Sequence, residues 1–375
     1  MNETVEEKEL YGFGLSRQKQ EEATGETGSI SVALVNNIAS KKTTLPSLFK
    51  AGSKQALALA EMEVVDKQRL VDRRGKEVYL TFKDMKYIYA LSHFLSLIRE
   101  REDVKKYVSL LSQGLTPDFN IILTIDIVAL TKFVEIDGNA RKRQKEATIR
   151  ELDRLANIKQ VITLGRKGEK ELKYVDSLIT IPTKLIDSTT DKSLDIDVVR
   201  VQLGYSFFYE LYNKYAVIKP ELFKLWGKKG SGTDTELFGV LLSDLLGKFS
   251  FHRIAAIQAV EKIKKKDYKT EDSFFKARSK AERNALTYSE TYDTIKQRVT
   301  TDYDSTREQK KRFYVDLARA LSTLVELGLI TSYSPADLSK AERLDVVFNK
   351  DYTKRSEPSE VEVKTKQQTL QELLS

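Results

Sequence analysis

Two adjacent segments decide the fold: NARKRQKEATIRELDRL, residues 139–155, and KQVITLGRKGEKELKYVDSLI, residues 159–179. In a helix over the first, Ile149, Leu152 and Ala156 lie on one side, whereas Arg143 and Arg150, seven residues apart, project from the other. The second contains two β-prone runs joined by GRKGEK, whose two glycines favour a hairpin turn. The pattern therefore predicts a basic helix followed by a basic β-hairpin.

The residues before this helix complete a helix-turn-helix pattern. Residues 120–124 favour a strand and residues 125–133 a short helix with Thr124 as its cap, while residues 136–138 supply the turn. Asn139 is a good cap for the longer helix that follows. Short helix, turn, basic helix and hairpin are the order of a winged helix-turn-helix unit.

An earlier segment predicts the helix that supports this unit. Thr81 is suited to cap a helix, and Asp84 favours the positive end of its dipole. Apolar residues then recur every three or four positions, as in a stripe facing a core: Phe82, Met85, Ile88, Leu91, Leu95 and Ile98.

The second half repeats the first at an ungapped offset of 169 residues. The triplet 141–143, RKR, corresponds to 310–312, KKR, and Arg150 corresponds to Arg319. Leu152 and Leu155 correspond to Leu321 and Leu324. Residues 326–333 and 344–348 then favour two strands of a second wing, and a preceding helix is expected near residues 289–298.

We therefore expect an α+β, mainly helical fold with two tandem winged helix-turn-helix domains, β-hairpin wings and flexible N- and C-terminal tails. The expected ranges are a flexible arm over residues 1–55, the first domain over 56–182, a connector over 183–232, the second domain over 233–350 and a flexible tail over 351–375. In the connector, the aromatic run of residues 205–212 predicts packing more than base stacking, because large aromatic side chains prefer burial.

Composition sets the broad class. The 375 residues carry a net charge of +8, and residues 138–173 hold eleven Lys or Arg against five Asp or Glu, so a polyanionic partner is permitted. The absence of cysteine excludes disulfides and thiolate metal sites, and no apolar run approaches the length of a membrane span. The acidic N-terminus lacks the features of a secretory signal. These features predict a cytoplasmic protein that does not bind membranes.

The basic helices and wing predict binding to double-stranded DNA. An α-helix fits the major groove, where Arg suits guanine and Asn or Gln suits adenine, while cationic wing tips suit phosphates. The candidate DNA-binding residues are Asn139, Arg141, Lys142, Arg143, Gln144 and Arg150 in the first helix, Arg166, Lys167 and Lys170 in its wing, and Lys310, Lys311, Arg312 and Arg319 in the second helix. Basic helix faces are usually only solvated. The same elements occur twice in the same order, however, and this favours DNA binding.

Enzymatic interpretations find little support in the sequence. Residues 227–232, GKKGSG, have the wrong order for a phosphate-binding loop, and His93 and His252 are too far apart to form a paired metal site. A tyrosine nucleophile, as in a recombinase, would lack the His-x-x-Arg spacing that accompanies it, since His252 is followed directly by Arg253. We expect a protein that is not an enzyme and that needs no metal or cofactor.

From about Leu80 to about Phe348 the chain resembles Rep-type plasmid and phage replication initiators, which have two tandem winged-helix domains. The resemblance rests on the order of elements and on the segments ATIREL, residues 147–152, and ALSTLVELGLI, residues 320–330. It implies binding to repeated origin sites, a homodimer, and recruitment of a host initiator or helicase. The arm before residue 50 and the insertion in the second unit depart from the pattern. A transcriptional regulator with two winged-helix modules is the main alternative, and a DNA recombinase is a more distant one.

Overall fold

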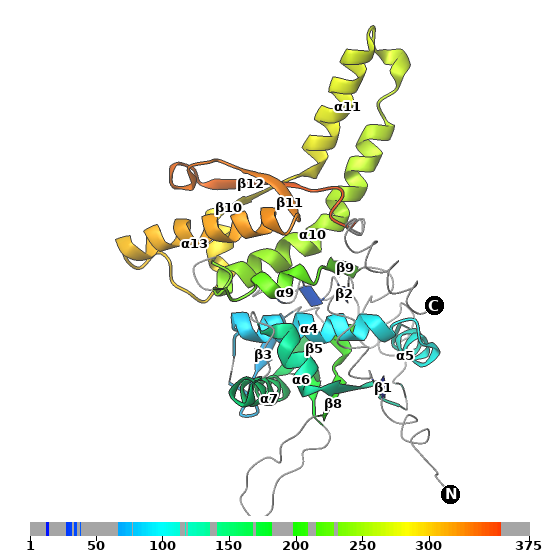
Figure 1. Ribbon diagram of the computed structural model, residues 1–375, viewed down its shortest axis with the longest axis vertical. Helices are drawn as coiled ribbons and strands as arrows, with labels where there is room; N and C mark the ends of the chain where they lie inside the picture. The colour runs from blue at the N-terminus through cyan, green and yellow to red at the C-terminus, as the bar shows by residue number, and fades with distance from the viewer. Residues whose placement is uncertain are drawn as a thin grey trace, which may run out of the picture.

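The computed structural model describes residues 13–14, 28–31, 34–35, 38, 67–76, 78–112, 117, 119–135, 141–167, 170–181, 198–208, 215–228 and 232–353. The side chains of residues 13–14, 31, 67–69, 112, 161–167 and 170–174 lie outside this description. Within it, helices alternate with small, mostly antiparallel sheets, in agreement with the predicted α+β class (Figure 1).

Seven elements occur twice in the same order: helix, helix, strand, helix, helix, strand, strand. The first series is α4 (Phe82–Ile98), α5 (Glu102–Ser112), β4 (Ile122–Asp126), α6 (Ile127–Val134), α7 (Lys142–Ala156), β5 (Lys159–Lys167) and β6 (Lys170–Ser177). The second is α10 (Glu236–Glu261), α11 (Glu271–Leu286), β10 (Thr287–Thr291), α12 (Tyr292–Gln297), α13 (Arg307–Glu326), β11 (Ile330–Ser334) and β12 (Arg343–Phe348). The predicted internal repeat thus extends to the observed order of elements.

The strands of the two series pair differently. In the second, β12 lies between β10 and β11, so the strand before the helix pair joins the hairpin that follows it. In the first, the hairpin β5–β6 pairs instead with β3 (Lys67–Val71). Its strand β4 pairs with β1 (Phe13–Gly14) and β8 (Val198–Leu203), and β8 separates it from β7 (Ile179–Thr180), which follows β6. A strand from the predicted connector is therefore inserted into the first unit.

Helix α4 lies between the two halves of the molecule and is buried on all sides (Figure 1). Every residue from Asp84 to Leu95 is buried, which is more than the single apolar stripe that the sequence predicted. Thr81 caps the helix as expected, accepting a hydrogen bond from Asp84 N, while Asp84 accepts one from Thr81 N. The predicted apolar stripe accounts for one side of α4, and polar groups with specific partners account for another.

The second half packs on α4 through α10. Gly239 of α10 lies so close to Met85 that a Cβ atom at residue 239 would meet the Met85 sulfur at 2.3 Å. Beside this contact, the hydroxyls of Tyr89 and Ser243 are 2.9 Å apart, and Trp226 is fully buried with its ring centroid 5.0 Å from that of Tyr89. The buried hydrophobic residues of both halves consequently form one continuous cluster.

Parts of the predicted arm and connector belong to this core, which corrects the expectation that they are only flexible or linking. Residues Gly28–Ser31 form β2, which pairs with β9 (Tyr215–Ile218), and Ile30 is fully buried. After β8, the short helix α8 (Tyr205–Phe208) buries Phe207 and Phe208, as the packing interpretation predicted. Helix α9 (Glu221–Leu225) leads to Trp226. These residues fill the space beside α4 because an antiparallel strand pair covers it.

Two helix boundaries differ from the predicted ones. Asp126, not Thr124, caps α6, accepting a hydrogen bond from Ala129 N at 2.8 Å, because β4 continues two residues further than expected. Helix α10 continues twelve residues beyond Phe249, the predicted end, and forms a projecting antiparallel hairpin with α11 (Figure 1). A short 3-10 turn, η3 (Lys265–Asp267), joins the two helices, so the predicted basic helix end lies at the exposed tip.

The burial of α13 generates a test of the core. Leu321 is fully buried, whereas Val325 on the same helix is 37% exposed. We expect Leu321→Ala to lower the free energy of unfolding by about 2–5 kcal/mol, because it removes buried methyl groups and leaves a cavity. Val325→Ala is the matched control and should change it by less than about 0.5 kcal/mol. Equal effects in urea unfolding would contradict this packing of α13.

Candidate nucleic-acid interface

Helix α7 presents a basic outer face. Lys142, Arg143, Glu146 and Arg150 are exposed, and at about 100° per residue the last three lie along one line of the helix. Among the described residues, Arg143 and Arg150 have no ion-pair partner. Two guanidinium groups are therefore available to an anionic or hydrogen-bonding partner on this face.

The inner face of α7 is fixed by a buried hydrogen-bond chain as well as by packing. Thr148 is buried, and its hydroxyl lies 3.0 Å from those of both Tyr87 on α4 and Thr131 on α6. Leu152 and Leu155 are buried on the same side. Because a buried hydroxyl without a partner costs free energy, these bonds favour one rotational setting of α7, with its arginines outward.

An ion pair anchors the C-terminal part of α7 to the start of α4. Arg154 Nη2 lies 3.0 Å from Oδ2 of Asp84, whose carboxylate is completely buried. Glu151 lies next to this pair, and burial together with the neighbouring Asp84 carboxylate raises the pKa of Glu151 to about 7. This end of α7 therefore carries a carboxyl group that titrates near neutral pH.

The raised pKa of Glu151 makes stability depend on pH in a defined direction. Since the folded pKa of about 7 exceeds the unfolded value, the stabilising effect of the protonated form is complete below about pH 4 and is lost as pH rises through 7. We expect the free energy of unfolding of wild type to fall between pH 5 and pH 8 relative to that of Glu151→Gln.

Urea unfolding at several pH values measures this difference. Glu146→Gln, at an exposed position of the same helix, is the matched control and should leave the wild-type pH profile unchanged. Parallel profiles for wild type and Glu151→Gln would show that Glu151 keeps an ordinary pKa in the folded protein.

Helix α13 presents a corresponding face. Lys310, Lys311, Arg312 and Arg319 are exposed, and Arg312 Nε lies 3.4 Å from Asp316 Oδ2. Its opposite side buries Phe313, Leu317, Leu321 and Leu324. A hollow of about 500 Å³ runs along the outer face, and its lining residues are Asp234, Thr235, Glu308, Lys311, Arg312, Val315, Asp316 and Arg319. This second face mixes cations with carboxylates more than the first does.

The sequence register of the two helices is also the register of their burial. At the offset of 169 residues, buried Thr148, Leu152 and Leu155 correspond to buried Leu317, Leu321 and Leu324. The preceding strand and helix repeat at an offset of 165 instead: Asp126 ends β4 and caps α6, and Thr291 ends β10 and caps α12. The four-residue difference lies in the connection between the paired helices, where the sequence showed a longer link in the second unit.

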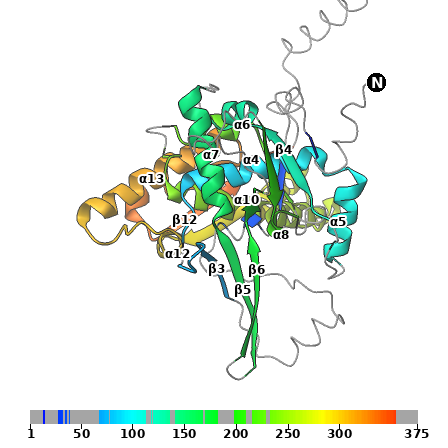
Figure 2. The same cartoon turned by 90° about the horizontal axis from the view of Figure 1, so that it is seen from below.

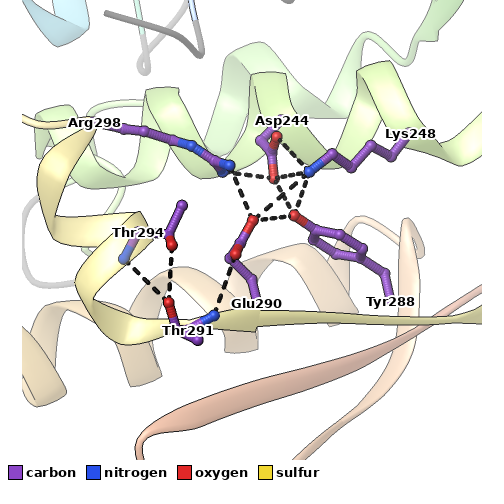
Figure 3. Close-up of polar contacts among 7 residues, drawn as sticks. All are labelled: Asp244, Lys248, Tyr288, Glu290, Thr291, Thr294 and Arg298. Atoms are coloured by element: carbon purple, nitrogen blue, oxygen red, sulfur yellow. Dashed lines mark hydrogen bonds and ion pairs between the residues drawn. The ribbon is translucent and has the colours of Figure 1, made fainter.

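A polar cluster ties α12 and β10 to α10 (Figure 3). Arg298, directly after α12, places Nη1 3.0 Å from Asp244 Oδ2 and Nη2 2.9 Å from Glu290 Oε2. Lys248 Nζ lies 3.1 Å from Asp244 Oδ1, and Tyr288 donates hydrogen bonds to both carboxylates. Two cations thus balance two carboxylates, and the cluster holds the first helix of the second pair in place without leaving a net charge.

The predicted wing residues are placed only in part. Arg166 and Lys167 lie at the end of β5 and Lys170 begins β6, with Lys167 opposite Lys170 at the hairpin end, while the side chains of all three lie outside the described part (Figure 2). In the second wing, Lys340 Nζ lies 3.0 Å from Asp337 Oδ2, and Arg343 Nε lies 3.6 Å from Asp345 Oδ1. The second wing therefore offers less unbalanced positive charge than the sequence of the first.

The remaining predicted residues fall into three groups. Asn139 lies outside the described residues, and Arg141, not Asn139, is the residue at which α7 begins. Gln144 is half-buried, and its Oε1 accepts a hydrogen bond from Arg141 N at 2.9 Å, so this amide supports the start of the helix. Lys142 and Lys311 correspond at the common offset and are both exposed. Sequence reasoning missed Glu146 and Val315, although the spacing of the arginines on either side could have identified them.

Comparison with known proteins gives limited information. No known protein family and no curated protein matches the sequence. A crystal structure of domains 2 and 3 of RctB is similar to this chain at 11% identity and a TM-score of 0.32, covering 76% of this chain and 94% of that one. At this TM-score, the likeness carries no information about what this chain binds.

Two searches of the described residues complete the description. None of the helices in this part of the chain is long and apolar enough to cross a membrane. The same residues contain no group of three or more histidine, aspartate or glutamate side chains placed to hold a metal ion.

Proposed function

We propose that the chain is a sequence-specific double-stranded DNA-binding protein in which two winged helix-turn-helix units insert α7 and α13 into the major groove. One observation carries the proposal: each helix buries its inner face and exposes two arginines seven residues apart, in the same register. Arginine forks suit the two acceptors of guanine in that groove. The duplicated exposure of arginines is more specific than a general excess of positive charge.

The other predicted groups would support binding around these helices. Lys142, Lys310 and Lys311 are exposed beside the arginines and suit phosphate contacts, which set affinity and register but carry no sequence information. The β5–β6 hairpin projects from the body (Figure 2) and would place the first wing against an adjacent part of the duplex. Two units in one chain would raise affinity when both dock on the same DNA.

The finer proposal is a plasmid or phage replication initiator that binds repeated origin sites in the cytoplasm and recruits a host initiator or helicase, with a homodimer among its states. The sequence resemblance and the tandem arrangement of two similar units support it. A transcriptional regulator would use the same two faces. The choice between these roles depends on where the cognate sites lie.

We further propose that the protein acts by binding and not by catalysis. Tyr288 lies beside Lys248 and Arg298, which are residues that could suit a phosphate, and is therefore the described tyrosine to consider as a nucleophile. Its hydroxyl donates to Asp244 and Glu290, and burial raises the pKa of Tyr288 well above its ordinary value. Two carboxylates would repel a phosphate, and a tyrosine with a raised pKa is a poor nucleophile at neutral pH.

The arginine pairs provide the direct test of DNA binding. Arg143→Ala with Arg150→Ala, and separately Arg312→Ala with Arg319→Ala, should each weaken binding to a selected duplex by roughly 100-fold or more, because a bidentate arginine–guanine contact contributes about 1–3 kcal/mol. Random duplexes are first enriched on wild type, and affinities are then measured at several salt concentrations.

A matched control separates specific contacts from loss of charge. Arg73→Ala with Arg74→Ala removes the same charge from an exposed turn far from α7 and α13 in sequence and should leave base selection unchanged. Equal losses in the control and in the two helix variants would reduce the interaction to non-specific attraction. Absence of duplex binding by wild type at low salt would contradict the proposal itself.

Location of the enriched sites tests the initiator role. We expect repeated sites near the gene to support replication of a reporter plasmid that lacks its own origin, and to do so only with the intact arginine pairs. Plasmid copy number is the measurement. Sites that overlap a promoter and repress it, without any plasmid maintenance, would favour the regulator instead.

A further inference from the structure

The two proposed recognition helices differ at the centre of their exposed faces. Glu146 lies between Arg143 and Arg150, and Val315, at the common offset, lies between Arg312 and Arg319. Each central residue follows the first arginine by three positions and precedes the second by four, so all three lie within about 60° around the helix axis. A helix that places its two arginines on DNA must bring the residue between them to the same groove.

The spacing fits one short run of base pairs. Seven residues of helix rise by about 10.5 Å, close to three base-pair steps of about 3.4 Å each. The arginines of one helix are thus placed to reach bases three steps apart, with the central residue over the steps between them. Glu146 and Val315 therefore occupy equivalent positions for reading a base edge.

Both central side chains are available for such a contact. Glu146 is exposed and has no hydrogen-bond or ion-pair partner among the described residues. Val315 is 47% exposed and lines the hollow of α13 together with Lys311, Arg312 and Arg319. An apolar side chain exposed between cations gains free energy when an apolar group covers it.

The two side chains select different pyrimidines in the major groove. A carboxylate accepts a hydrogen bond from the N4 amino group of cytosine, whereas thymine presents the O4 acceptor at that edge and repels it. Valine can neither donate nor accept, but its methyl groups can contact the C5 methyl of thymine, which cytosine lacks.

On this basis, and resting on the proposed DNA-binding function, we propose that the two units read different half-sites. Glu146 specifies cytosine between the guanines contacted by Arg143 and Arg150. Val315 specifies thymine between the guanines contacted by Arg312 and Arg319. The full site is then a pair of related but unequal elements, and the two winged units are not interchangeable.

Reciprocal substitutions test the assignment. Glu146→Val should change the preferred central base of the first half-site from cytosine to thymine, and Val315→Glu should change that of the second from thymine to cytosine, each by about tenfold in relative affinity. Full-length protein is used, with random-duplex selection followed by affinity measurements on duplexes that differ only at the central base pair. Both positions are exposed, so the variants should unfold at the same urea concentration as wild type.

Val325→Glu is the matched control, because it makes the same change at an exposed position near the end of α13. It should leave both base preferences unchanged. If wild type selects a duplex through its arginine pairs but both swapped variants keep the wild-type central bases, the assignment is wrong while DNA binding stands. A switch to any other base would also overturn it. If wild type selects no duplex, the proposed function fails as well.

Discussion

The close contact between α4 and α10 is the constraint on which the rest of the structure depends. Met85 occupies the space that a side chain at residue 239 would need, so a glycine is required for the two helices to approach. Lys86 Nζ donates to the carbonyl of Trp226 at 2.8 Å on the same helix, and Tyr89 reaches Ser243. Burial lowers the pKa of Lys86 to about 8, which records the cost of placing this amine between the two halves.

From this contact the positions of the two exposed faces follow. Successive residues of α4 face different neighbours: Met85 and Tyr89 meet α10, whereas Asp84 and Tyr87 hold α7 through Arg154 and Thr148. The same helix thus supports both units. On the far side of α10, Asp244 and Lys248 hold Glu290 and Arg298 and so position α12 before α13. Polar contacts with few alternative partners, more than apolar packing, determine how each exposed helix is rotated.

The sequence predicted the local pattern of the site well and the tertiary arrangement less well. The helical period around Leu152 and Leu321 identified the inner and outer faces of α7 and α13, because burial follows that period directly. The insertion of β8 and the pairing of β2 depend on contacts distant in the chain, for which a short run such as Gly28–Ser31 carries no periodic signal. The full burial of α4 was also missed, since Lys86 and Asp84 look like surface residues until their partners are known.

The repeat shows where the two units have diverged and where they have not. The inner-face positions remain buried in both helices even though a hydroxyl in one, Thr148, corresponds to an aliphatic group in the other, Leu317. Thr148 needs Tyr87 and Thr131 as partners, whereas Leu317 needs only apolar neighbours, so the first unit depends on hydrogen bonding where the second depends on packing. Because the two units share one core through α4 and α10, divergence in how each helix is held need not alter the distance between them. The outer faces are free of that constraint, and differences there can change recognition without disturbing the fold.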